Sequence, residues 1–168
     1  SVSQNWDAAE IMKFADGYLS NDRRHQLKMR GSYALSPEWV LSGNVTILSG
    51  APISCFDYYS ADGGPLTDPI GYRGSYHTCF GKPSPPGVKR MPWQHRLDLG
   101  VTYRPAFADH KLALSLNVLN LLNETNPTVI NSNVSGIRLP RYTVQNTYNM
   151  PLSYDTPRYV MFSASYDW

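Results

Sequence analysis

The segment RYVMFSASYDW, residues 158–168, decides the fold of this chain. Every second residue of it is apolar, and polar residues alternate with them towards the carboxyl end. The apolar row is Val160, Phe162, Ala164, Tyr166 and Trp168. Because successive side chains of a β-strand point to opposite faces of the sheet, this alternation predicts a strand with one apolar and one polar face. A strand of a soluble sheet would show the same alternation.

The same period of two recurs in four further segments. Residues 25–35 and 39–47 are separated by a tight Ser36-Pro37 turn and are expected to form a hairpin. Residues 96–104 and 112–118, joined by a short turn, are expected to form a second one. Residues 2–6 are interpreted as the stub of an earlier strand. The expected fold class is therefore all-β and antiparallel.

Long polar stretches separate these hairpins, at residues 7–23, 50–92 and 121–157. Loops of this length are unusual in compact domains. Short turns at one end and long loops at the other are typical of outer-membrane β-barrels. The short-turn end also collects aromatic residues, as an interfacial girdle would. These are Tyr33, Trp39, Tyr103, Phe107, Tyr166 and Trp168.

The polar rows of the predicted strands carry several charges. They are Lys28, Arg30, Arg96, Asp98, Arg104 and Lys111. Charges enclosed by a sheet must be hydrated or paired, so these side chains are expected to face a wet lumen. About eight strands already fill a barrel with side chains, so about six could not close around long cations. The missing strands must come from the rest of the same protein or from another chain.

Five segments carry a resemblance to a known family. They are NDRRHQLK at 21–28, SGAPISC at 49–55, PWQHRLD at 92–98, LNVLNLLN at 116–123 and PRYVMF at 157–162. With the terminal aromatic strand, they make essentially the whole chain resemble the TonB-dependent outer-membrane receptors, and within them the Oar-like branch.

The resemblance implies an up-and-down transmembrane barrel of about 22 strands filled by an N-terminal plug. Residues 1–168 would be its C-terminal part, about the last six strands, with the plug and the remaining strands absent from this chain. The implied partners are the rest of the barrel, the plug, the TonB system acting through that plug, and outer-membrane lipid. The implied location is the outer membrane of a Gram-negative bacterium, with long loops outside and the C-terminus periplasmic. In this family the insertion machinery engages the last strand, which makes Phe162, Tyr166 and Trp168 the expected assembly signal.

Cys55 and Cys79 are the only cysteines, and both fall in the long middle loop. In an oxidising, extracellular setting they are expected to form a disulfide. A metal site that adds His77 and Asp57 is the weaker alternative, because the spacing matches no zinc pattern. The formal charge of +2, with Lys and Arg scattered, gives no indication of nucleic-acid binding.

No nucleophile elbow, HExxH helix or P-loop occurs, so neither an enzyme nor a cofactor is expected. Aromatic and Arg side chains in the loops are the candidate substrate contacts, although the tyrosines would equally serve to pack the loops. These candidates are Tyr58, Tyr59, Tyr72, Tyr76, Arg138, Arg141 and Tyr142. The expected function is to form the barrel wall and extracellular loops of a transporter for active uptake. A passive porin or adhesin barrel, or a secreted carbohydrate-binding β-sandwich, are the alternatives.

Overall fold

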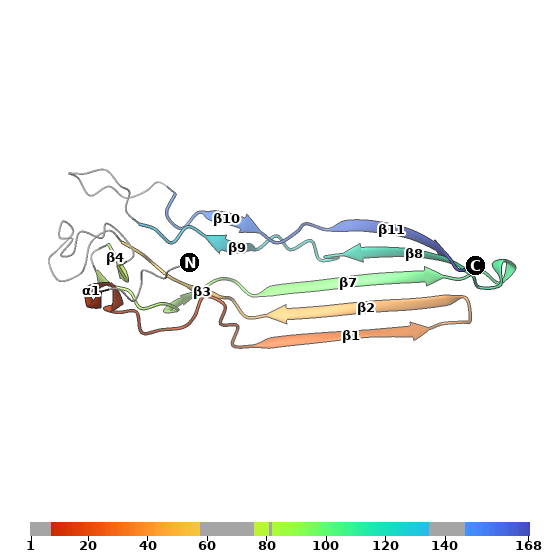
Figure 1. Ribbon diagram of the computed structural model, residues 1–168, viewed down its shortest axis with the longest axis horizontal. Coiled ribbons are helices and arrows are strands. Elements are labelled where there is room, and N and C mark those ends of the chain that lie inside the picture. The colour runs from red at the N-terminus through yellow and green to blue at the C-terminus, as the bar shows by residue number, and fades with distance from the viewer. Residues whose placement is uncertain (1–7, 58–75, 81, 135–146) are drawn as a thin grey trace. The chain divides into compact units, whose positions relative to one another are not determined.

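The computed structural model describes residues 8–57, 76–80, 82–134 and 147–168, and it is all-β with antiparallel sheets (Figure 1). The chain divides into two compact units. The sheet unit comprises Arg24–Ser49, Trp93–Asn126 and Asp155–Trp168. The loop unit comprises Ser1–Arg23, Gly50–Pro92 and Pro127–Tyr154. The regular alternation in the sequence therefore maps onto one unit and the long polar stretches mainly onto the other.

Five long strands form the sheet unit, in the order β1-β2-β7-β8-β11. They are β1 (Gln26–Ala34), β2 (Trp39–Leu48), β7 (Gln94–Tyr103), β8 (Leu112–Leu119) and β11 (Tyr159–Tyr166). A 3-10 helix, η3 (Ala106–Ala108), lies in the short β7–β8 connection. The five strands predicted from the period of two are thus confirmed. The expected stub at residues 2–6 lies outside the described residues.

The pairing register separates the side chains of the sheet into two faces. Lys28 pairs with Thr46, and Thr46 pairs with Arg96, which puts all three side chains on one face, here called the polar face. The opposite, apolar face carries an uninterrupted row across all five strands. This row is Tyr33, Leu41, Val101, Leu116 and Phe162. Sequence alternation and strand pairing therefore agree on which side chains share a face.

The sheet unit is a single layer without a hydrophobic core of its own. In its described residues only Ser49, Pro105 and Asn120 are buried, whereas the buried hydrophobic residues of the described chain all lie in the loop unit. On the apolar face, Tyr33 is 69% exposed and Phe162 is 66% exposed. Within the described part of this unit no second sheet or helix packs on either face (Figure 1). The apolar face therefore stays exposed within the described part of the sheet unit.

The loop unit contains short elements where the sequence predicted only loops. They are α1 (Ala9–Met12) and the pairs β3 (Pro52–Ile53) with β6 (Lys89–Arg90), β4 (Thr78–Cys79) with β5 (Lys82–Pro83), and β9 (Pro127–Ile130) with β10 (Pro151–Tyr154). Strands of two to four residues are too short to show an alternation of apolar and polar residues. Three of them begin with proline, a residue that is typical of turns and loops. The prediction that these residues form only loops was wrong.

A disulfide between Cys55 and Cys79 confirms the predicted pairing and cross-links the loop unit. The two Cα atoms are 5.5 Å apart, and the Tyr148 hydroxyl lies 3.3 Å from each sulfur atom. The bond therefore joins the segment after β3 to β4 and lies against a residue from a third part of the chain.

Arg90 connects two further segments of the loop unit. Its Nη1 donates hydrogen bonds to the carbonyl oxygens of Asp22, at 3.2 Å, and Gly50, at 3.1 Å. It also forms an ion pair with the Asp22 carboxylate, and its guanidinium lies 5.1 Å from the centre of the Tyr18 ring. Glycine is required at position 50, because a Cβ atom there would lie 1.6 Å from the carbonyl oxygen of Met91.

Removing the disulfide should loosen the loop unit and leave the sheet intact. On the chain-entropy model, closing a loop of this length stabilises the folded state by about 3.5 kcal/mol. Limited proteolysis of the Cys55→Ala/Cys79→Ala variant should therefore cut the loop segments much faster than in the wild type. A Cys79→Ser variant should behave like the double variant, and unchanged cleavage rates in both would contradict this role.

Candidate functional site

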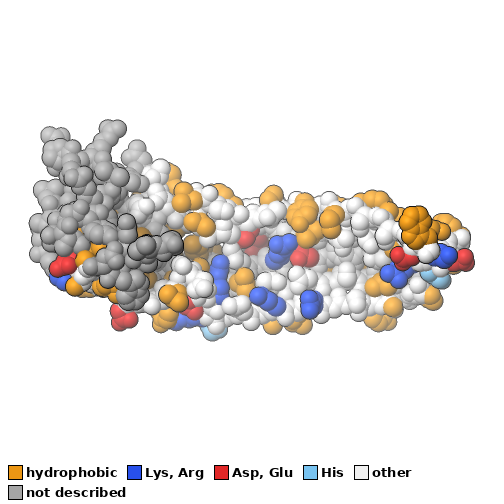
Figure 2. Space-filling model, viewed as in Figure 1, with side chains coloured by type: hydrophobic (Ala, Val, Ile, Leu, Met, Phe, Trp, Pro, Cys, Tyr) orange, Lys and Arg blue, Asp and Glu red, His pale blue; other side chains and the backbone are white. Residues whose placement is uncertain are grey.

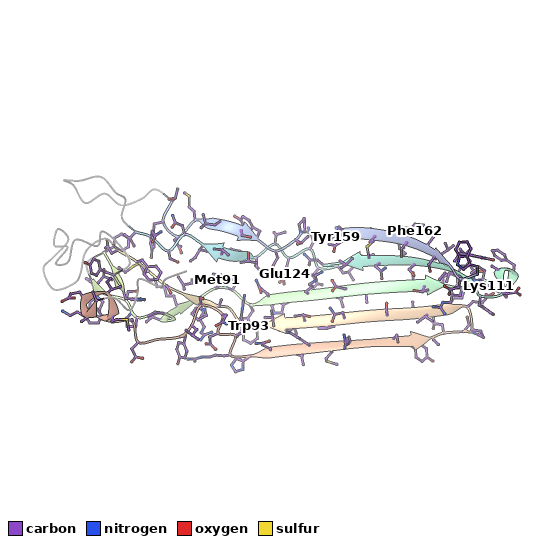
Figure 3. The ribbon with its side chains drawn as sticks, in the orientation of Figure 1. Met91, Trp93, Lys111, Glu124, Tyr159 and Phe162 are labelled. Carbon is purple, nitrogen blue, oxygen red and sulfur yellow. A yellow bond between two sulfur atoms is a disulfide. The ribbon has the colours of Figure 1, made fainter. Side chains whose placement is uncertain are left out.

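The polar face is hollowed at the end of the sheet that lies away from the short turns. The hollow has a volume of about 510 Å³ and is lined by side chains from β1, β2 and β7 and from the segments that follow β8 and precede β11. Its ionisable residues are Lys28, His95, Arg96, Asp98, Glu124 and Asp155. Figure 2 shows Lys, Arg, Asp and Glu side chains over the middle of the sheet. In Figure 3, Glu124 and Trp93 lie at this end and Lys111 lies at the other.

Asp98 occupies the centre of this polar surface. Its carboxylate accepts hydrogen bonds from Arg96 Nε at 3.0 Å, from Asn44 Nδ2 at 3.0 Å and from the backbone N–H of Asn120 at 2.8 Å. These donors come from β7 itself, from the neighbouring β2 and from the residue after β8. The Asp98 carboxylate is thus held by an ion pair with Arg96 and by hydrogen bonds from β2 and from the residue that follows β8.

Asn120 closes the connection between β8 and β11. It is 4% exposed and has a positive φ of 51°, a backbone conformation that asparagine tolerates better than most residues. Its Nδ2 donates to the carbonyl oxygens of Glu124, at 2.8 Å, and Thr156, at 2.9 Å, and its Oδ1 accepts from the Glu124 N–H at 3.2 Å. Asn120, which belongs to the LNVLNLLN segment, therefore has a structural role, because its side chain joins three segments of the chain.

Glu124 extends the network towards β7. Its Oε2 accepts from the backbone N–H of His95 and from Asn126 Nδ2, both at 3.0 Å, and its Oε1 lies 3.1 Å from His95 Nδ1. Asn126 also donates to the carbonyl oxygen of Trp93 at 3.0 Å. Each carboxylate of the network is engaged by donors from neighbouring segments. This arrangement holds strand ends together.

Four of the six residues expected to face a lumen share the polar face. Lys28, Arg30, Arg96 and Asp98 lie on it by register, whereas Arg104 and Lys111 lie just outside the ends of β7 and β8. Among the described residues, Lys28 and Arg30 have no ion-pair partner, whereas Arg96 pairs with Asp98. The strand rows of the polar face therefore carry a net positive charge.

Of the candidate substrate contacts in the loops, the structure describes only Tyr76. Six of them lie outside the described residues, namely Tyr58, Tyr59, Tyr72, Arg138, Arg141 and Tyr142. Tyr76 is 1% exposed, and its backbone pairs with that of Asp57. This burial favours packing of the loops as its role. The described residues contain no group of three or more His, Cys, Asp or Glu side chains that could hold a metal ion.

The expected assembly residues lie in and just after the last strand. Phe162 and Tyr166 project from the apolar face of β11, and Trp168 lies beyond its end, fully exposed. Phe162 is labelled on this strand in Figure 3. The sequence did not predict Asn120 or Glu124 as site residues, although Asn120 lies inside the LNVLNLLN segment. Only spatial proximity shows that they meet.

His77 is a buried titratable residue in the loop unit. It is 9% exposed, its ring packs edge-on against Phe56 at 5.0 Å between centres, and its Nδ1 has no hydrogen-bond partner. Burial lowers the pKa of His77 from its usual value of 6.5, because the charged ring would lose its hydration.

Comparisons of this chain with protein-family models, with curated proteins and with solved structures find no match. No helix in the described part of the chain is both long and apolar enough to cross a membrane. The interpretation of the site therefore rests on its geometry and on the residues themselves.

Replacing Asn120 should weaken the end of the sheet. Asn120→Gly keeps the positive φ accessible but removes the side-chain hydrogen bonds, which leaves the partly buried backbone carbonyl groups of Glu124 and Thr156 without these donors, at a cost of about 1–3 kcal/mol. Asn120→Ala should cost more, because it adds backbone strain. Thermal unfolding measures both, with Asn117→Ala as the control on the polar face. Equal stability of wild type and Asn120→Gly would contradict the role.

Acidification should loosen the loop unit through His77. Because the pKa of His77 is lowered on folding, its contribution to stability is fully present above about pH 6.5 and is lost as the pH falls below that value. Protease sensitivity of the loop unit should therefore rise between pH 7.5 and pH 5, and His77→Gln should flatten this dependence. His110→Gln, at an exposed turn, is the control and should keep the wild-type response.

Proposed function

We propose that this chain forms part of the wall and the external loops of a TonB-dependent outer-membrane transporter for active uptake. The observation that carries the proposal is a single-layer sheet whose apolar face is exposed and whose other face bears charges. In water such an apolar face would be a strong liability. In a bilayer it is the surface that lipid requires, and the charged face then borders water.

The dimensions of the strands support a membrane location. A transmembrane β-strand needs about 9–11 tilted residues. β1 has 9 residues, β2 and β7 have 10 each, and β8 and β11 have 8 each. Each of these five strands pairs antiparallel with the next of the five along the chain. Strand length, up-and-down order and alternation therefore all fit the pattern of an outer-membrane barrel.

The edges of the sheet support a larger barrel. β1 and β11 each pair with a neighbour on one side only in the described sheet. An unpaired edge in lipid leaves backbone groups without partners, at several kcal/mol each. Strands from the rest of the protein or from another chain would satisfy both edges. A wide barrel would also give Lys28 and Arg30 the water that their charges require.

Active uptake comes from the resemblance of five sequence segments to TonB-dependent receptors of the Oar-like branch. The proposed partners are a plug, the TonB system that acts through it, and outer-membrane lipid, with loops outside and the C-terminus in the periplasm. We propose no bond chemistry and no cofactor for this chain. A passive porin or adhesin would use the same sheet, and a plug domain in the same protein distinguishes the transporter from both.

A secreted β-sandwich would need a second sheet over the apolar face. The described residues of the sheet unit provide none. A protein of that kind would stay soluble and monodisperse without detergent, whereas a barrel segment with this apolar face would not. Extraction of membranes with and without detergent therefore separates these two classes.

Neighbouring residues of β2 should differ sharply in their accessibility. Ser42→Cys on the polar face should react with a water-soluble maleimide in intact outer membranes, whereas Leu41→Cys on the apolar face should be shielded by lipid. The two native cysteines are paired and provide an unreactive background. Both variants should react after denaturation in detergent, which controls for thiol integrity. Preferential labelling of Leu41→Cys would invert the assigned faces, and equal labelling would argue against a membrane location.

A further inference from the structure

The loop unit contains a cavity that the proposed barrel wall does not require. Its volume is about 650 Å³, within the range of about 300–1,000 Å³ that is typical of small-molecule sites. Its walls come from three segments, within residues 20–23, 51–56 and 128–132, together with Met91, which is labelled in Figure 3. We call it the loop cavity. All of these residues belong to the loop unit, so the cavity lies within one compact unit.

Two strands that are joined at one end and separate at the other create this cavity. The Phe56 N–H donates to the Ser132 carbonyl at 2.8 Å, and the Val134 N–H donates to the Phe56 carbonyl at 2.9 Å. Away from this junction, β3 pairs with β6 and β9 pairs with β10, so each turns to a partner of its own. The space between them is lined by both strands and stays open.

The wall of the loop cavity is mainly apolar. Its larger apolar side chains are Pro52, Ile53, Phe56, Met91, Val129 and Ile130. Of the described residues that line the cavity, only Arg23 is ionisable, and Arg23 already interacts within the protein. A charged solute would lose hydration on entering without gaining a free counter-charge from these residues, which is much more costly than the transfer of a neutral solute. The wall therefore favours a neutral solute.

Three hydroxyl groups in the wall are available to such a solute. They belong to Ser54, which follows β3, to Thr128 in β9, and to Ser132, which follows β9. All three residues are partly buried, and among the described residues none of their hydroxyls has a hydrogen-bond partner. A solute that displaces water from these groups must replace the hydrogen bonds that the water made. The hydroxyls therefore favour a solute that carries a polar group as well as an apolar body.

Contacts within the protein hold the wall in place. Arg90 holds the segment at Asp22 beside Gly50, and Phe56 follows directly on the disulfide-bonded Cys55. A wall held in this way loses little conformational freedom on binding, which favours affinity.

We propose that the loop cavity binds a small neutral solute with an apolar body and a hydroxyl or carbonyl group, which forms hydrogen bonds with Ser54, Thr128 or Ser132. This goes beyond the proposed function, because binding in the loop unit does not require that the sheet cross a membrane. Failure of the cavity experiment would leave the maleimide result at Ser42 and Leu41 unaffected.

Displacement of a neutral fluorophore tests the proposal. Prodan, a neutral naphthalene ketone, is titrated onto the detergent-solubilised full chain, and the signal of micelles without protein is subtracted. It is then displaced with phenylbutanol, phenylbutyrate and phenylbutylamine, which share one apolar body and differ in the charge of the head group. We expect saturable binding of prodan, and displacement by the alcohol at a concentration about tenfold lower than by either charged relative.

Matched variants assign that binding to the cavity. Ile130→Trp fills the space and should weaken binding of prodan and phenylbutanol alike, whereas Leu152→Trp, at an exposed position of β10 outside the cavity, should not. Thr128→Val removes one hydroxyl at nearly constant volume and should weaken phenylbutanol binding by about fivefold, the effect of losing one hydrogen bond. Thr125→Val, whose side chain does not line the cavity, should bind phenylbutanol like the wild type.

Any of four results would overturn the proposal. The first is the absence of saturable prodan binding, and the second is displacement by a charged relative at the same concentration as by phenylbutanol, or lower. The third is wild-type prodan affinity in Ile130→Trp, and the fourth is wild-type phenylbutanol affinity in both Thr128→Val and Ser54→Ala.

Formation of the Cys55–Cys79 disulfide in each variant shows that the loop unit has folded, so a loss of binding in a folded variant supports the assignment. If Ile130→Trp does not fold, the two hydroxyl variants decide, because they change the volume of the wall only slightly.

Discussion

The absence of a core beneath the five-stranded sheet is the constraint on which the rest of the structure depends. Backbone pairing holds β1, β2, β7, β8 and β11 together, but the apolar side chains of the described sheet unit gain little burial from one another. Burial of apolar surface within the described sheet unit therefore contributes little to its stability. The loop unit, by contrast, buries Ile11, Tyr76 and Val134, and it contains the cross-link between the two cysteines.

Where packing is missing, hydrogen bonds set the geometry. Asp98 and Asn120 connect β2, β7, β8 and the approach to β11 through side chains that replace a core at this end of the sheet. Such groups add little net stability when they are exposed to water, but leaving one unpaired in a dry environment is costly. A polar network of this kind therefore specifies the strand arrangement more than it contributes stability.

The sequence predicted the long strands because a period of two persists over eight to ten residues in each of them. It predicted the disulfide because Cys55 has one possible partner. It did not predict β9 and β10, which are too short to show a period, nor the meeting of Asn120 with Thr156, which depends on contacts between distant segments.

The disulfide also changes how far apart two strands of the sheet are along the covalent chain. β2 ends at Leu48 and β7 begins at Gln94, and the Cys55–Cys79 bond bypasses about half of the residues between them. Because each halving of a flexible loop lowers its closure cost by about 0.6 kcal/mol, oxidation before folding brings the first hairpin closer to the second. The cross-link in the loop unit therefore also favours formation of the sheet, because it lowers the entropic cost of bringing β2 and β7 together.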